Sequence, residues 1–140
     1  MTRLPRGALP DGVFHATARG VRRSRLFVND DDYALFVHLL RHIGASAMWR
    51  LHAYCLMPNH YHAVIESSTP RLSSGMHRLN GRYAQDFNSR HDLVGHVFEG
   101  RYRSRVIGEE EYLAAACRYV RDNPLRAGLC QRAEDWPWSG

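Results

Sequence analysis

Apolar and polar residues alternate in four short stretches of the chain, a pattern typical of β-strands with one buried face. The first stretch covers residues 12–18 and the last covers residues 97–107. Between them lie residues 49–57 and 60–66, which are separated only by a Pro-Asn dipeptide. Because this dipeptide favours a tight turn, the two middle stretches are predicted to form a β-hairpin.

Apolar residues at helical spacing predict three helices between and after these strands. The first begins after Asn29, which is followed by three aspartates that suit a helix N-terminus, and it ends at Gly44. The second covers residues 72–90. The third begins at residues 109–111 and ends near Asn123, because the proline that follows disfavours helix at the residue before it.

The order of elements is therefore strand, helix, strand, strand, helix, strand, with one extra helix at the end. This is the β-α-β-β-α-β pattern of ferredoxin-like folds. We expect an α+β fold, in which a four-stranded antiparallel sheet carries two helices on one face and an additional C-terminal helix. Since a chain of 140 residues has the ordinary size of one domain, residues 1–140 are expected to form a single domain.

Composition narrows the class of protein. The content of 44% hydrophobic and 24% charged residues is that of a globular protein and argues against intrinsic disorder. No apolar run approaches the roughly 18 residues of a membrane helix, and the first dozen residues lack the apolar stretch of a secretory leader. Three cysteines without a C-x-x-C pair favour neither a disulfide framework nor a cysteine zinc site. We therefore expect a cytoplasmic protein that binds no membrane.

The formal net charge is +5, and all 19 basic residues are arginines. A positive chain of this size indicates a polyanionic partner. The absence of lysine has two explanations, codon bias in a GC-rich genome and the use of arginine for bidentate phosphate recognition. Codon bias accounts better for the missing lysine, while the charge itself still indicates a polyanion.

Several arginines share one face of the last predicted strand. Alternation places Arg101, Arg103 and Arg105 together, opposite the apolar residues of this stretch. Such a row suits a phosphate backbone, and a plain solvated face has the same pattern. Arg78 and Arg82, one helical turn apart, would extend the row. Further arginines lie in the first loop, namely Arg19, Arg22, Arg23 and Arg25.

His60 and His62 are the first candidates for chemistry. They alternate along a predicted strand, so both side chains project from the same face. Two adjacent imidazoles can chelate a divalent metal. Two unrelated histidines would produce the same pattern in a chain that contains nine of them. The spacing alone leaves both interpretations open.

Tyr119 and Asn123 form a second pair, at positions i and i+4 of the third predicted helix, which places the phenol and the amide on one face. The opposite face is apolar and is expected to contact the core. Tyr119 is thus predicted to lie off the core, beside a side chain that carries a ligand oxygen. An amphipathic tyrosine at a helix edge is the simpler alternative.

The two pairs make chemical sense as one site. Two imidazoles and the amide oxygen of Asn123 would hold Mg²⁺ or Mn²⁺ and leave positions open for a substrate phosphate. Tyr119, one helical turn away, would then attack phosphorus and form a covalent intermediate. Because a protonated phenol is a poor nucleophile, the site also needs a proton acceptor or a strong positive potential, and the sequence identifies no such base.

The segment Leu-Met-Pro-Asn-His-Tyr-His, which ends at His62, resembles the HUH signature of REP-associated tyrosine transposases. These are single-tyrosine, IS200-like transposases that act on single-stranded DNA hairpins. Other segments resemble the family in the same order along nearly the whole chain. They are Arg19-Gly20, Asp31-Asp32-Tyr33, residues 95–102, residues 123–128 and residues 136–139.

The resemblance implies a ferredoxin-like fold and the metal-dependent cleavage and rejoining of single-stranded or hairpin DNA by a nucleoid-associated protein. His60, His62 and Asn123 would be the metal ligands, and Tyr119 would be the nucleophile that forms a 5′-phosphotyrosine link. Asn123 stands where related transposases often carry glutamine. This departure is mild, because both amides offer a carbonyl oxygen.

Three questions stay open at this point. A domesticated hairpin-binding protein without turnover and a nickase of the replication-initiator or relaxase type are alternatives to a transposase. A homodimer, in which the tyrosine of one subunit serves the histidines of the other, and a monomer both agree with the sequence. The preferred metal and the recognised hairpin are not specified by any motif.

Overall fold

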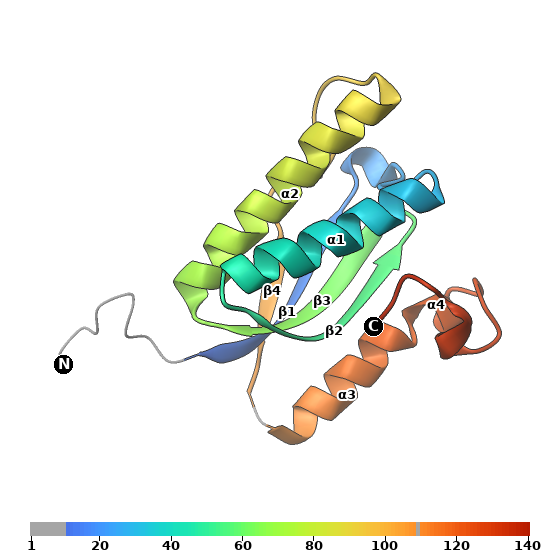
Figure 1. Cartoon of the computed structure of the whole chain (residues 1–140). Coiled ribbons are helices and arrows are strands. Elements are labelled where there is room, and N and C mark those ends of the chain that lie inside the picture. Colours follow the sequence, from blue (N-terminus) through green and yellow to red (C-terminus); the bar gives the residue numbers. More distant parts are fainter. Residues whose placement is uncertain (1–10, 109) are drawn as a thin grey trace.

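A computed structural model describes residues 11–108 and 110–140 of the chain. Four strands form one sheet, namely β1 (Gly12–Arg19), β2 (Arg50–Met57), β3 (His60–Ser67) and β4 (Arg103–Ile107). The order across the sheet is β2-β3-β1-β4, and every neighbouring pair is antiparallel (Figure 1). This is the arrangement expected from the order of elements, so the α+β, ferredoxin-like fold class is confirmed.

Helices lie on both faces of this sheet. Two long helices, α1 (Asp30–Ser46) and α2 (Thr69–His91), lie side by side over one face (Figure 1). The helix α3 (Glu110–Arg121) packs on the opposite face, mainly against β2 and β3. Three single turns complete the described elements, namely η2 (Val21–Arg23), α4 (Asn123–Arg126) and η3 (Ala133–Asp135).

Strand alternation divides the buried residues between the two faces. In β3, Ala63 and Ile65 point into the core under α1 and α2, whereas Val64 points toward α3. The core under α1 and α2 contains large aromatic side chains, among them Phe27, Phe36, Tyr61 and Tyr83. The core under α3 is smaller and consists of Ala53, Cys55, Met57, Val64, Cys117 and Val120. The apolar face predicted for the third helix is therefore the one that contacts the sheet.

Two predicted helix ends are wrong, each for its own reason. The helix α2 begins at Thr69 rather than at residue 72, because the Ser68 side chain caps it by accepting a backbone N–H of the first turn. Gly44 does not end α1, which continues to Ser46. A Cβ atom on Gly44 would lie 3.3 Å from the Trp49 ring, and one on Gly75 of α2 would lie 2.2 Å from the same ring. Gly44 is thus present because Trp49 packs between the two helices.

The fourth strand and the third helix are shorter than predicted. Gly100 has a φ value of 67°, which breaks the predicted strand between residues 99 and 101. As a result Arg101 precedes the strand instead of sharing a row within it. The helix α3 ends at Arg121 and Asn123 begins α4, so the two side chains of the predicted pair lie on different helices. Residue 109, at the expected start of this helix, lies outside the described residues.

The segment after η3 returns to the sheet and pairs with the outer side of β2. Tyr54 and Gly140 exchange two backbone hydrogen bonds of 2.9 and 3.0 Å, and the Leu56 N–H donates to the Trp138 carbonyl at 2.9 Å. The Trp138 ring also stacks on Tyr33 of α1, with centroids 5.0 Å apart. These contacts hold the segment against both the sheet and α1.

Candidate active site

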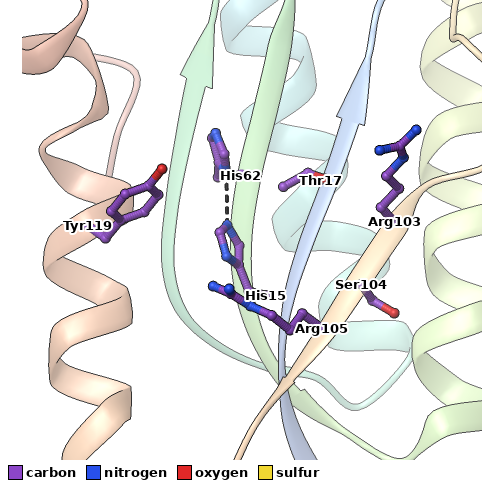
Figure 2. Close-up of a pocket in the computed structure, with 7 residues that line it drawn as sticks. All are labelled: His15, Thr17, His62, Arg103, Ser104, Arg105 and Tyr119. Atoms are coloured by element: carbon purple, nitrogen blue, oxygen red, sulfur yellow. Dashed lines mark hydrogen bonds between the residues drawn. The ribbon is translucent and has the colours of Figure 1, made fainter.

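A pocket of about 440 Å³ opens on the sheet face that carries α3 (Figure 2). Its residues come from β1, β3, β4 and α3, and we call it the histidine pocket. They are His15, Thr17, His62, Arg103, Ser104, Arg105 and Tyr119. The pocket thus brings together four of the predicted site residues, which are far apart in the sequence.

The register of the sheet explains why these side chains meet. Thr17 of β1 lies opposite His62 of β3 on one side and opposite Arg103 of β4 on the other. Because side chains alternate along a strand, His15 projects from the same face as Thr17. Polar side chains from three neighbouring strands therefore converge on the face that lies away from the aromatic core.

His15 and His62 are in direct contact. The His15 Nε2 and His62 Nδ1 atoms lie 2.8 Å apart, so one of these nitrogens donates a hydrogen bond to the other. His15 is only 9% exposed, and this bond satisfies one of its two polar atoms. The residue was not singled out from the sequence. The available signal was its place on the polar face of residues 12–18, in a strand that the fold puts beside His62.

His60 lies next to His62 on β3 but does not line the histidine pocket. The two ring centroids are 5.0 Å apart, and the ring planes are nearly perpendicular, at 80°. The His60 Nδ1–H donates to the Asn59 Oδ1 at 2.8 Å, because an amide oxygen can only accept. This tautomer leaves the lone pair of His60 on Nε2.

All three histidines are held toward the neutral form. Burial, followed by repulsion from the neighbouring histidines and arginines, lowers the pKa of His62 to about 3. Burial and the charge of Arg19 lower the pKa of His60, and burial and the charge of Arg105 lower the pKa of His15. Neutral imidazole is the form that binds metal ions.

Tyr119 projects from α3 toward the strands, with its hydroxyl on the side of His62 (Figure 2). Its ring centroid lies 6.5 Å from that of His62 and 6.3 Å from that of His15. The residue is 52% exposed, as predicted for a tyrosine that lies off the core. A ligand in the histidine pocket can therefore reach the phenol.

Arg126 of α4 fixes the position of Tyr119 from a second side. Its Cζ atom lies 4.0 Å from the centre of the Tyr119 ring, within the range of a cation–π contact. Its Nη2 group also donates to the Tyr119 carbonyl oxygen at 2.6 Å. The short turn after α3 thus returns a positive charge to the ring, a contact that no local pattern in the sequence indicates.

Asn123 occupies the first position of α4 and does not line the histidine pocket. Its Nδ2 atom is buried and has no hydrogen-bond partner in the described part of the chain. An amide can be turned so that its oxygen and nitrogen exchange places. In either orientation one polar atom of Asn123 is buried without a partner, which is an expensive arrangement unless a ligand completes it.

The predicted arginines fall into three places rather than one continuous row. Arg105 lines the histidine pocket, and Arg103 borders both that pocket and a second one beside it. Arg19, Arg22, Arg23 and Arg101 line only the second pocket. Arg78 and Arg82 lie in a different groove, formed by α1 and α2 on the other face of the sheet.

Side chains of α1 and α2 engage these last two arginines. Arg82 forms an ion pair with Asp86 at 3.1 Å, and Arg78 donates to the Ser46 hydroxyl at 3.3 Å. The structure therefore separates Arg78 and Arg82 from the arginines of β4, because the sheet itself lies between them. Arg78 and Arg82 therefore do not extend the row of arginines on β4, because the helix and the strand present these side chains on opposite faces of the sheet.

Comparison with known proteins identifies the family. The sequence model of the family described as transposase, IS200-like, matches residues 11–123. The chain belongs to the IS200-like transposases. No curated protein matches this IS200-like transposase.

Two solved structures share the fold of this IS200-like transposase. A REP-associated tyrosine transposase bound to a REP hairpin has a TM-score of 0.79 and 18% identity, over 99% of this chain and 82% of the other. A candidate transposase from Deinococcus radiodurans R1 has a TM-score of 0.56 and 18% identity, over 86% of this chain and 97% of the other. The family match supports the resemblance noted in the sequence, and the two structures support its fold.

The residues of this IS200-like transposase can be tested for their fit to a divalent metal. Within the described ranges, no three His, Cys, Asp or Glu side chains form a group that could hold a metal ion. The expected ligand set is not of this type, because it consists of two histidine imidazoles and the amide of Asn123. The neutral imidazoles of His60 and His62, with ring centroids 5.0 Å apart, and the Nε2 lone pair of His60 suit such an ion. The unpartnered amide of Asn123 would suit it when turned so that its oxygen takes the place of Nδ2.

The described helices of this IS200-like transposase include none that is both long and apolar enough to span a membrane.

Proposed function

We propose that this IS200-like transposase cleaves and rejoins single-stranded DNA by covalent catalysis through Tyr119. The observation that carries the proposal is the histidine pocket, in which the exposed Tyr119 ring faces His62 and two arginines of β4. A nucleophile, a candidate metal ligand and phosphate-binding cations thus border one cavity. The similarity to a structure bound to a REP hairpin supports hairpin DNA as the partner.

In the proposed reaction, the phenolic oxygen of Tyr119 attacks a phosphorus atom of the DNA backbone. The phenol gives up its proton as the new bond forms, the bond from phosphorus to the 3′ oxygen breaks, and the 3′ oxygen takes up a proton and leaves as a free hydroxyl, so the step consumes no net proton. The phosphate stays on Tyr119 as a 5′-phosphotyrosine link. Rejoining is the reverse step, in which a 3′-hydroxyl attacks this link. Arg103 and Arg105 would bind the other phosphate oxygens, where negative charge accumulates.

His60, His62 and Asn123 are the residues that would hold Mg²⁺ or Mn²⁺. A bound divalent ion would act as a Lewis acid on a phosphoryl oxygen. His62 suits this role when its Nδ1 carries the proton of the bond to His15, because its Nε2 then keeps a lone pair. The same applies to His60, whose Nδ1–H is engaged by Asn59.

Arg126 is a positioning residue in this proposal. By contacting the ring and the carbonyl oxygen of Tyr119, it restricts the phenol to the side of the histidine pocket. Tyr119 and His62 come from the same chain, and their ring centroids lie 6.5 Å apart. This proximity supports a site that is complete in one subunit and does not need the tyrosine of a second copy.

A covalent-adduct assay tests the proposal. The protein is incubated with a labelled single-stranded hairpin and with Mg²⁺ or Mn²⁺, and the products are separated under denaturing conditions. We expect a protein–DNA adduct that disappears in EDTA and in Tyr119→Phe. Tyr112→Phe is the matched control, because Tyr112 lies on the same helix and is 58% exposed but does not line the histidine pocket.

The outcomes separate the alternatives. An adduct that persists in Tyr119→Phe would show that another residue is the nucleophile. Tight binding without cleavage across many hairpins would favour a DNA-binding protein without turnover. An adduct that forms equally well in EDTA would remove the metal from the proposal and leave the covalent step in place.

A further inference from the structure

A second pocket, of about 380 Å³, adjoins the histidine pocket. It contains Arg19, Arg22, Arg23, Arg101, Arg103 and Glu99, and we call it the arginine pocket. Thr17 and Arg103 line both pockets. A DNA strand with a phosphate beside Tyr119 would therefore place a neighbouring nucleotide in the arginine pocket. The volume is in the range of small-molecule sites, which is roughly 300–1,000 Å³.

Glu99 has no evident role in binding a phosphate backbone. It is an exposed acid among five arginines, and no salt bridge within the described residues includes it. A carboxylate repels phosphate, so it weakens a site that binds only the backbone. A carboxylate does accept hydrogen bonds from the N–H groups of a base. The presence of Glu99 therefore indicates that the arginine pocket binds a base as well as a phosphate.

Backbone hydrogen bonds hold Glu99 beside the end of β1. The Glu99 N–H donates to the Arg19 carbonyl at 2.9 Å, and the Val21 N–H donates to the Val97 carbonyl at 2.9 Å. The loop that carries Arg22 and the segment that carries Glu99 are thus joined to each other. A flexible surface acid would lack such support.

The loop also adopts an unfavourable backbone conformation. Arg22 and Arg23 have φ values of 53° and 61°, which are uncommon for residues other than glycine. A Cβ atom on Gly20 would lie 2.0 Å from the Ser24 carbonyl oxygen, so the loop closes tightly on itself. Strained backbone of this kind concentrates at functional sites. It directs two consecutive arginines into the arginine pocket.

Guanine is the base whose chemistry matches this set. Its Watson–Crick edge offers two adjacent N–H donors to one carboxylate, and its O6 and N7 atoms accept from arginine. Cytosine and adenine each offer one amino group, and thymine offers one N–H. We infer that the arginine pocket binds a guanine nucleotide of the single strand next to the cleaved phosphate, with Glu99 as the residue that selects the base. This inference rests on the proposed function.

Binding measurements test the inference without cleavage. The probe is a DNA hairpin with a single-stranded thymine tail in which one guanine is moved through successive positions. Affinity is measured by fluorescence anisotropy in EDTA. We expect one guanine position to tighten binding by about tenfold, the scale of a good bidentate base contact. Replacing that guanine with inosine, which lacks the amino group, should remove most of the gain.

Glu99→Gln should abolish the preference between guanine and inosine while the protein remains folded, because the residue is exposed. Glu134→Gln is the matched control, since it removes the same charge from an exposed residue outside both pockets. If Glu99→Gln tightens binding to every tail equally, its role is electrostatic and the inference is wrong. A preference for cytosine over guanine would also overturn it.

The adduct assay distinguishes this failure from failure of the proposed function. Glu134→Gln, which changes a residue outside both pockets, should still form the Tyr119-dependent adduct with a hairpin that the wild-type protein cleaves. If the wild-type protein forms no adduct with any hairpin, the proposed function fails, whatever the base preference. If the adduct forms but no guanine position affects binding, the inference alone fails.

Discussion

On the sheet face that α1 and α2 cover, large aromatic side chains are completely buried, whereas the buried residues under α3 are small and leave the β4 side open. Phe36, for example, is 0% exposed and contacts the rings of Phe27, Tyr61 and Tyr83. Tyr119 on the other face is half exposed. The same strands therefore support two environments, because alternate residues point to opposite faces.

The difference explains how a small domain can hold an open site without losing its fold. Most of the described buried apolar side chains lie under α1 and α2, and their burial stabilises the fold, so the opposite face can keep polar residues and solvent access. The polar residues there, such as His15 and His62, are costly to bury unless they are hydrogen-bonded. Their mutual contact reduces this cost.

The largest expected effect is a difference in the free energy of unfolding between substitutions on the two faces of the sheet. Phe36→Ala should lower the free energy of unfolding by about 3–5 kcal/mol, the usual loss for a buried phenylalanine. Tyr119→Phe should change it by less than about 0.5 kcal/mol, because it removes one hydroxyl from an exposed side chain. Urea denaturation of both variants measures this contrast. Equal losses would mean that the face with α3 contributes as much stability as the other.

A smaller effect is expected within the site itself. Arg126→Ala removes a cation–π contact of about 0.5–1 kcal/mol and a hydrogen bond of about 1 kcal/mol. If these contacts position Tyr119, the rate of adduct formation should fall roughly tenfold with little change in DNA affinity. Arg126→Lys should restore part of the rate through its charge.

Arg118→Ala is the control for this measurement, because Arg118 is an exposed arginine on α3 that does not line the histidine pocket. A parallel loss of DNA affinity and rate in Arg126→Ala would indicate that Arg126 binds the phosphate backbone instead. The split between affinity and rate is therefore the decisive readout.

The most gradual effect concerns pH. The pKa of His62 is about 3 in the folded protein against 6.5 ordinarily, so the unfolded chain binds more protons between these values. The stability due to neutral His62 is present above pH 6.5 and is lost as the pH falls toward 3. Partial exposure to solvent moderates the loss.

Urea denaturation in EDTA across this pH range measures the slope for the wild-type protein and for His62→Asn. The variant should have the shallower slope. Identical slopes in the two proteins would contradict the depressed pKa of His62.

Most of the fold could be predicted from the sequence because its signals are local. Strand alternation, helical spacing and the Pro-Asn turn need only neighbouring residues. The errors arose where distant residues decide the outcome. Gly44 resembles a helix stop locally, but it remains helical because Trp49 packs on it. The break before β4 did have a local signal, because Gly100 lies inside the alternating stretch and adopts positive φ.

The site was predictable only where one strand or one helix carries it. His60 and His62 were found because they alternate on one strand, and the exposure of Tyr119 followed from the apolar face of its helix. His15 contacts His62 through the register of β1 with β3, which the sequence does not specify. Arg126 reaches Tyr119 only because the chain turns into α4.

The segment at residues 138–140 closes the outer side of β2 with backbone hydrogen bonds. An unpaired strand edge is a template on which another chain can extend the sheet, so this closure protects one edge from aggregation. The other edge is β4, which pairs only with β1 in the described sheet. If β4 strands of two copies paired there, Arg103 and Arg105 would bring like charges together. The arginines proposed to bind DNA would therefore also keep two copies of the sheet from joining.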